Sequence, residues 1–496
     1  MPDTWSNETP WRSYGAGVLS DSRRGPAHRR FTIAACVAAG ITLVAACGSS
    51  ASGPKPSKPA AGGTVFAPAG DGFVQAWHVS GDNRRQITIA KPDGSTAHRV
   101  SLPFEPLTAF PVGGGKVLYT STGSSLALVD SDSGAATKVS TPDDDYSPSN
   151  VQLSFAAPYV QRYLLLQPHT LTHSVLLDVT SGKTFDIASR LGGDGLVTYA
   201  VSSPDGSHVL FGDSSRAVLL TPDASGGAHQ FEDFSFPSCF TADGTAIVIE
   251  QAAGQGRRVV AFDPASGKTR TLKERPHADG PVIATCAGST VVVTAGSGGG
   301  IDLVPVAGGT SRHLTAVPKD LSRVVPASDG RHVLLGSGSD ADSSWWMLDI
   351  DAGTVAALPA LSGANPGGGT LAQRYRVFLP AGTSPGSLGS KLLGFDSYTG
   401  KVTPLTFSSG RVVTGTAGTS SADGKIRSFL GSSLAVSSYV ADLSTGSVRS
   451  YPHPTSVSPA GDRLLQTIPR RNVQITDLQS KTLASLAADT GVWTAT

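Results

Sequence analysis

The chain has 496 residues, a formal net charge of +1 and only 16% charged residues. Because there is no basic excess, nucleic acid is not expected as a partner. Hydrophobic residues make up 39% of the sequence, which is enough for a packed core, and the 58 glycines and 33 prolines indicate many tight turns. The composition therefore predicts an all-β protein and argues against a disordered or mainly helical one.

Residues 1–46 are predicted to be an export signal with a long polar leader. Arg29 and Arg30 precede the segment Phe31–Ala46, which carries no charge. A basic flank followed by a short apolar run is typical of a secretory signal. The run has 16 residues, fewer than the roughly 20 that span a bilayer as a helix, so an uncleaved anchor is the second choice. Phe31 follows the arginine pair directly, which departs from a twin-arginine signal and leaves the export route open.

The segment VAAC that ends at Cys47 resembles the bacterial lipobox, in which small residues precede a cysteine that receives a diacylglycerol. The resemblance implies a lipid anchor at Cys47 on the extracytoplasmic side of the cell membrane. The segment IAAC that ends at Cys36 has the same pattern, but it would leave too short an apolar run for a signal. A secretory signal with a coincidental cysteine is the alternative. Residues 47–63, rich in Ser, Gly and Pro, are predicted to form a flexible tether.

Residues 64–496 repeat one phrase, which consists of a short apolar run, Asp, two variable residues, Ser or Thr, and Gly. An example is AFDPASGK around Gly267. Asp begins a turn by accepting backbone N–H groups, and Gly provides the positive φ that closes a hairpin. The turn positions, spaced by 34 to 48 residues, are Gly94, Gly134, Gly182, Gly226, Gly267, Gly308, Gly353, Gly400, Gly446 and Ser480. A period of this length is typical of a propeller blade.

A second phrase lies roughly 20 residues before several of these hairpins. It reads SSPDGSHVLFG around Gly206 and PASDGRHVLLG around Gly330. Together the two phrases predict four strands per period, hence a β-propeller of four-stranded antiparallel blades with about ten repeat units. Because four to eight blades are usual, we expect one ring of seven or eight blades with extra strands, a larger single ring, or two rings. Residues 491–496 are expected to form a closing strand against the first blade.

These hairpins and turns resemble those of the WD40-like, TolB-like and YVTN-type β-propellers of exported bacterial proteins. The resemblance covers about residues 64–490 and implies the fold. It does not select a function, because such propellers include binding proteins, scaffolds and enzymes. The Trp motif that follows the turn glycine in quinoproteins is missing, so no quinone and no other cofactor is expected.

Cys239 and Cys286 lie in equivalent strands of adjacent units. A disulfide is permitted outside the cytoplasm, but aligning the units by their turns offsets the two cysteines by two residues. A bridge and two buried thiols therefore both remain open.

Other candidates have structural explanations. His169 and His173 have the spacing of a metal pair on a helix, but they fall in a predicted turn without a nearby carboxylate or thiol, so no metal site is expected. Residues 143–145 form an acidic loop that lacks the ligand spacing of a Ca²⁺ site. Ser214, in the segment GDSS, has no recognisable His or Asp partner, and no catalytic residue is assigned.

Repeated positions are also expected to be structural. His208 and His332 occupy the same place in two units and are predicted to bond a neighbouring strand. Trp345 and Trp346 are expected in the core by default, although an exposed ring would be a binding contact at the propeller rim. The repeated aspartates are predicted to form turns and not to bind ligands: Asp178, Asp263, Asp349, Asp396 and Asp442.

These observations predict a membrane-anchored propeller that binds a protein or an envelope ligand and has no catalytic activity of its own. One alternative is a hydrolase or lyase with its site at the central channel. Another is a structural spacer in an envelope complex.

Overall fold

The computed structural model describes residues 71–495 with interruptions. The segments that are not described are 122–124, 142–161, 167–173, 192–196, 198, 214–215, 222–226, 232–234, 252–255, 276–281, 296–299, 319, 339–341, 367–372, 384–386, 408–411, 414–417, 434–435 and 470–471. Among the described residues, no helix is long and apolar enough to cross a membrane.

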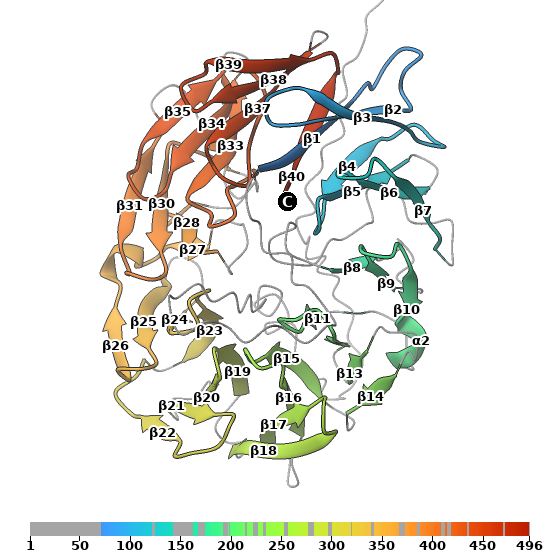
Figure 1. Cartoon of the computed structure of the whole chain (residues 1–496). Helices are drawn as coiled ribbons and strands as arrows, with labels where there is room; N and C mark the ends of the chain where they lie inside the picture. The colour runs from blue at the N-terminus through green and yellow to red at the C-terminus, as the bar shows by residue number, and fades with distance from the viewer. Residues whose placement is uncertain are drawn as a thin grey trace, which may run out of the picture.

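Ten antiparallel sheets form one closed ring (Figure 1). Of the three expected arrangements, the larger single ring is confirmed, and each of the ten units counted in the sequence becomes a blade of it. Each sheet packs only on its two neighbours, so the number of blades is not limited by a shared core.

The first five blades are built as follows. The first contains β1 (Asp71–Trp77), β2 (Gln86–Ala90), β3 (Thr96–Ser101) and β40 (Thr490–Ala495). The second contains β4 (Thr108–Pro111), β5 (Lys116–Thr120), β6 (Leu126–Asp130) and β7 (Ala136–Val139). The third has β8 (Tyr163–Leu166), β9 (Val175–Asp178) and β10 (Thr184–Asp186), followed by α2 (Ala188–Leu191). The fourth has β11 (Tyr199–Ser202), β12 (Val209–Gly212), β13 (Ala217–Leu220) and β14 (Ala228–Gln230). The fifth has β15 (Phe236–Phe240), β16 (Ala246–Gln251), β17 (Arg257–Asp263) and β18 (Lys268–Arg275).

The other five complete the ring. The sixth blade contains β19 (Val282–Ala287), β20 (Thr290–Ala295), β21 (Ile301–Pro305) and β22 (Arg312–Leu314). The seventh has β23 (Leu321–Pro326), β24 (His332–Ser337), β25 (Ser344–Asp349) and β26 (Thr354–Ala357), then the 3₁₀ turn η6 (Pro359–Leu361). The eighth has β27 (Asn365–Pro366), β28 (Tyr375–Leu379), β30 (Lys391–Asp396) and β31 (Val402–Thr406). The ninth has β29 (Leu388–Gly389), β32 (Val412–Val413), β33 (Ile426–Ser433), β34 (Val436–Asp442) and β35 (Val448–Tyr451). The tenth has β36 (Thr455–Val457), β37 (Arg463–Ile468), β38 (Asn472–Asp477) and β39 (Thr482–Leu486).

The core lies in the seams between blades. Side chains alternate along each middle strand, so both sides of a sheet are apolar. In β8, Leu164 and Leu166 pack toward the second blade, whereas Tyr163 and Leu165 pack toward the fourth. The short apolar runs of the sequence are therefore strands buried on both faces.

The last strand closes the ring, as predicted. β40 pairs with β1 in antiparallel register, with Trp493 opposite Val74, and becomes the innermost strand of the first blade (Figure 1). The first blade therefore combines strands from both ends of the described chain. This pairing covers the edge of β1 that an open sheet would expose.

The two kinds of predicted turn come together at one end of the ring, which we call the turn face. One kind joins the first and second strands of a blade, and the other joins the third and fourth. Neighbouring turns touch, because the Ala242 N–H donates to the Gly288 carbonyl and the Ala422 N–H to the Pro459 carbonyl, each at 2.9 Å. The remaining connections, within and between blades, lie at the opposite end, which we call the loop face.

Candidate binding face

The repeated aspartates at the turn face form turns, as predicted. Asp178 Oδ1 accepts the Thr180 N–H at 2.9 Å, and Asp442 Oδ1 accepts the Ser444 N–H at 2.8 Å. Asp263, Asp349 and Asp396 accept backbone N–H groups of their own turns in the same way. Their carboxylates are thus committed to the hairpins.

Three of these aspartates also pair with an arginine that directly precedes β8, β24 or β28. In each pair, Nε and Nη2 of the arginine donate to the two carboxylate oxygens of the aspartate. The pairs are Arg162–Asp178, Arg331–Asp349 and Arg374–Asp396. The hydrogen bond from Arg331 lowers the pKa of Asp349 to about 2. The pairs tie the two kinds of turn within a blade, so the turn face is a structural surface.

The two repeated histidines also belong to this framework. His332 Nδ1 lies 2.5 Å from Asp329 Oδ2 in its own turn, and its Nε2 lies 3.9 Å from Asp349 on the adjacent strand. His208 Nδ1 lies 2.6 Å from Ser207 Oγ. These contacts agree with a structural role for both residues.

Trp345 is not a rim residue. It is 2% exposed, its Nε1 donates to the Ala364 carbonyl at 2.7 Å, and its ring meets Phe378 edge-on at 5.2 Å. Trp345 therefore packs in the core, as expected by default, because β25 is a middle strand whose faces are covered by adjacent blades. Trp346 points into the opposite seam and is partly buried against Leu335 and Leu348.

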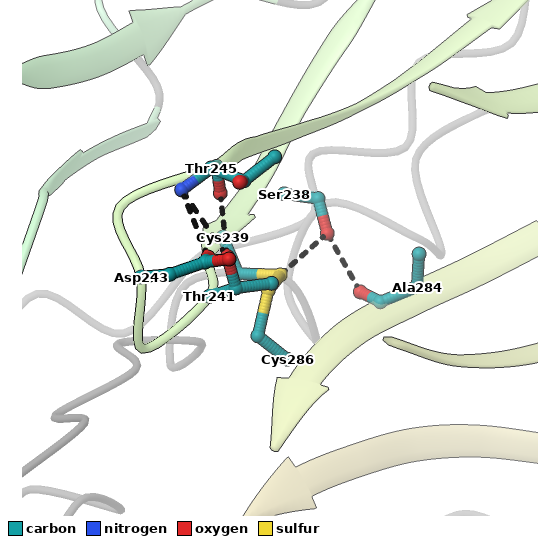
Figure 2. The surroundings of a disulfide bond; sticks show 7 residues. All are labelled: Ser238, Cys239, Thr241, Asp243, Thr245, Ala284 and Cys286. Atoms are coloured by element: carbon teal, nitrogen blue, oxygen red, sulfur yellow. Dashed lines mark hydrogen bonds between the residues drawn. A yellow bond between two sulfur atoms is a disulfide. The ribbon is translucent and has the colours of Figure 1, made fainter. Parts of the chain in front are cut away.

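Cys239 and Cys286 form a disulfide between the fifth and sixth blades (Figure 2). Their Cα atoms are 5.9 Å apart, and both side chains are buried. Cys239 of β15 faces the sixth blade because its neighbour Phe240 faces the fourth, while Cys286 of β19 faces the fifth. Ser238 Oγ donates to the Ala284 carbonyl at 2.8 Å, which adds a hydrogen bond between the two blades beside the disulfide (Figure 2).

Charged groups at the loop-face end of the same two blades form a compensated cluster. Asp302, whose side chain is 2% exposed, accepts from Lys273 Nζ at 3.2 Å and lies 2.8 Å from His313 Nδ1. Arg275 of β18 also bonds Asp302. Glu250 is held separately by Arg258 at 2.8 Å. The cluster joins β18 to β21 across the seam and therefore has a structural role.

Exposed hydrophobic side chains gather toward the loop face. Among the described residues, large hydrophobic side chains are exposed at Val79, Leu107, Leu388, Leu430 and Leu483. The first two lie in the connections around β1 and β4, and the next two lie in β29 and β33. Leu483 alone belongs to an outermost strand, β39.

Leu388, Val413 and Leu430 form one row, which we call the apolar row. β29 leaves the eighth blade and pairs with β32 of the ninth, with Leu388 opposite Val413. Val412 pairs with Gly431, so the antiparallel register places Val413 beside Leu430. Val412 is buried toward the eighth blade, hence the apolar row faces the tenth.

Sequence reasoning missed the apolar row. Its one local signal is Leu388, an isolated leucine within the turn-rich segment SPGSLGS. The crossing of β29 into the next blade depends on tertiary pairing that local patterns do not encode.

Several predicted sites lie outside the described residues: Cys36, Cys47, residues 143–145, His169, His173 and Ser214. Within the described part of the chain, no group of three His, Cys, Asp or Glu side chains is placed to hold a metal ion.

No protein-family model matches the chain, and no curated protein matches its sequence. Several solved structures resemble this chain in part. A eukaryotic initiation factor is 12% identical with a TM-score of 0.44, and the match covers 85% of this chain and 98% of that one. The β-propeller domain of the Trilobed protease from Pyrococcus furiosus is 11% identical with a TM-score of 0.35, covering 69% and 97%. A TolB protein from Agrobacterium tumefaciens is 16% identical with a TM-score of 0.28, covering 58% and 88%. These likenesses concern the fold alone.

Proposed function

We propose that the chain is an exported, lipid-anchored β-propeller that binds a protein or another envelope ligand at its loop face. The apolar row is the observation that carries the proposal. Single exposed hydrophobic residues are normal on protein surfaces, whereas adjacent ones mark a contact surface. Leu388 and Leu430 are each 49% exposed and lie on either side of Val413.

The Cys239–Cys286 bridge supports export, because disulfides persist in oxidising compartments and are rare in the cytosol. Export agrees with the signal predicted in residues 1–46. A lipid on Cys47 and a tether over residues 47–63 would then hold the propeller at the membrane with its loop face free to meet a ligand.

The binding proposal is tested by crosslinking in cells, followed by mass spectrometry of the captured proteins. Wild-type chain is compared with a Leu388→Ser/Leu430→Ser variant. The matched control is Val79→Ser/Leu107→Ser, which removes two hydrophobic side chains that are at least as exposed and lie elsewhere at the loop face. We expect one partner to be captured by the wild type and the control and lost from the apolar-row variant at unchanged melting temperature. Equal capture by all three chains, or no capture by a folded and abundant wild type, contradicts the proposal.

Anchoring is tested separately by replacing Cys47 with Ala and, as the control, Cys36 with Ala. We expect Cys47→Ala to move the protein from the membrane fraction to the soluble exported fraction, and Cys36→Ala to leave it in place. Membrane retention of Cys47→Ala would exclude this cysteine as the anchor.

A further inference from the structure

Two adjacent blades carry arginine at a core position. Arg376 of β28 and Arg427 of β33 each lie opposite the third-strand residue that directly precedes the turn-forming aspartate. The other eight blades have a buried aliphatic residue there: Val74, Val117, Leu164, Val209, Ala246, Val291, Val333 and Leu464. Each arginine thus replaces a small apolar side chain within a seam.

The Arg376 guanidinium is buried against the seventh blade. The residue is 3% exposed, and its Nη2 donates to the Pro326 carbonyl at the end of β23 at 3.2 Å. Its Nε and Nη1 have no hydrogen-bond partner in the part of the chain that the structure describes. Asp396, the acidic residue next to its cross-strand partner Phe395, is already held at both oxygens by Arg374.

Arg427 has different hydrogen-bond partners. Its Nη2 donates to Gln373 Oε1 at 3.2 Å, and Gln373 Nε2 donates in turn to Ser420 Oγ at 2.9 Å. The ninth blade therefore supplies its arginine with a polar chain. Among the described residues, the seam at Arg376 offers its guanidinium a single carbonyl, that of Pro326.

The arrangement at Arg376 is costly without a counter-charge. Burial lowers the pKa of Arg376 to about 9, so the side chain is still cationic at neutral pH. An uncompensated buried charge is strongly destabilising, and each buried donor left without a partner adds to this. Water would satisfy the donors but would leave the charge uncompensated.

We infer that Arg376 binds a small inorganic anion, of the size and charge of chloride, in the seam between the seventh and eighth blades. The Nε–H and Nη1–H groups are its donors. The anion is small because the neighbouring seam is filled by Trp345, Phe378 and Phe395. It offsets the buried positive charge and links the two blades.

The proposal is tested on the full chain by thermal unfolding in sodium chloride and in sodium gluconate at matched ionic strength. A ligand that binds only the folded state raises the melting temperature as its concentration rises. We expect chloride to raise the wild-type melting temperature by several degrees over gluconate. Arg376→Leu, which installs the residue type of the third and tenth blades, should show no difference between the salts. Arg427→Leu is the matched control and should keep the chloride effect.

Absence of a chloride effect in the wild type, or its persistence in Arg376→Leu, overturns the proposal. Should Arg376→Leu not fold, bromide-soaked crystals of the wild type decide the question. An anomalous bromide peak within hydrogen-bond distance of Nε or Nη1 supports the anion site. A water molecule there, without bromide, overturns it.

Discussion

The Thr494 hydroxyl bonds the backbone of Phe73 on both sides, accepting its N–H at 2.9 Å and donating to its carbonyl at 3.1 Å. This joins the last described strand of the chain to the first. Gln75 extends the contact to the second blade, because it accepts from the Tyr119 hydroxyl at 2.9 Å and donates to Ser131 Oγ at 2.8 Å. Burial raises the pKa of Tyr119 well above its ordinary value, so it acts here as a neutral donor.

Removal of residues 490–496 should open the ring. Loss of β40 exposes the edge of β1 and the seam filled by Trp493, so we expect a lower melting temperature and aggregation. A synthetic peptide of residues 488–496 added to the truncated chain should restore the melting temperature in part. A truncated chain that stays monomeric at the wild-type melting temperature contradicts the assigned role of β40.

Thr494→Val keeps the shape of the side chain and removes the hydroxyl. The Phe73 N–H then lacks this partner in a partly buried place, and we expect a loss of about 1–3 kcal/mol in the free energy of unfolding. Denaturant titration measures the loss. Thr482→Val, at an exposed position of the outermost strand β39, is the control and should change little.

The Cys239–Cys286 bridge should stabilise the ring against unfolding. The two cysteines are 47 positions apart, and closing a loop of this length is worth about 2–4 kcal/mol. Reductant should therefore lower the melting temperature of the wild type and leave that of Cys239→Ala/Cys286→Ala unchanged. A reductant effect of equal size in both proteins would show that the bridge is not its cause.

The pairing of Arg331 with Asp349 should make stability depend on pH in the acid range. In the folded protein the pKa of Asp349 is about 2, below its ordinary value of 3.8. The ionised carboxylate therefore stabilises the folded state fully at pH values above 3.8. The stabilisation is lost as the pH falls from about 4 toward 2, when the folded carboxylate is protonated. Asp349→Asn should be less stable by up to about 1 kcal/mol at neutral pH, because the pair is partly exposed. The difference in the free energy of unfolding between the wild type and Asp349→Asn should disappear in acid. Urea titrations at several pH values would measure it.

Local chemistry made much of the fold predictable from the sequence. The turn positions depend on Asp and Gly within a few residues of one another, and even Ser480 adopts φ of 70° where other blades have glycine. The closing strand also followed from the repeat. The size of the ring and the pairing of Cys239 with Cys286 depend on how neighbouring blades meet. The apolar row and Arg376 likewise become visible only when neighbouring blades are in place.

The turn glycines allow a comparison of backbone conformation with packing. Gly267 and Gly446 both have positive φ, 67° and 82°. A Cβ on Gly267 would meet nothing within 4 Å, whereas one on Gly446 would lie 2.8 Å from the Pro404 carbonyl oxygen of the preceding blade. Gly267→Ala should therefore lower the free energy of unfolding by about 1–2 kcal/mol through backbone strain alone. Gly446→Ala should lower it more, because its Cβ also meets the Pro404 carbonyl. Denaturant titration of both variants separates the two effects. Equal losses would show that the hairpin of the ninth blade is free to move away from β31, and that this contact does not hold the two blades together.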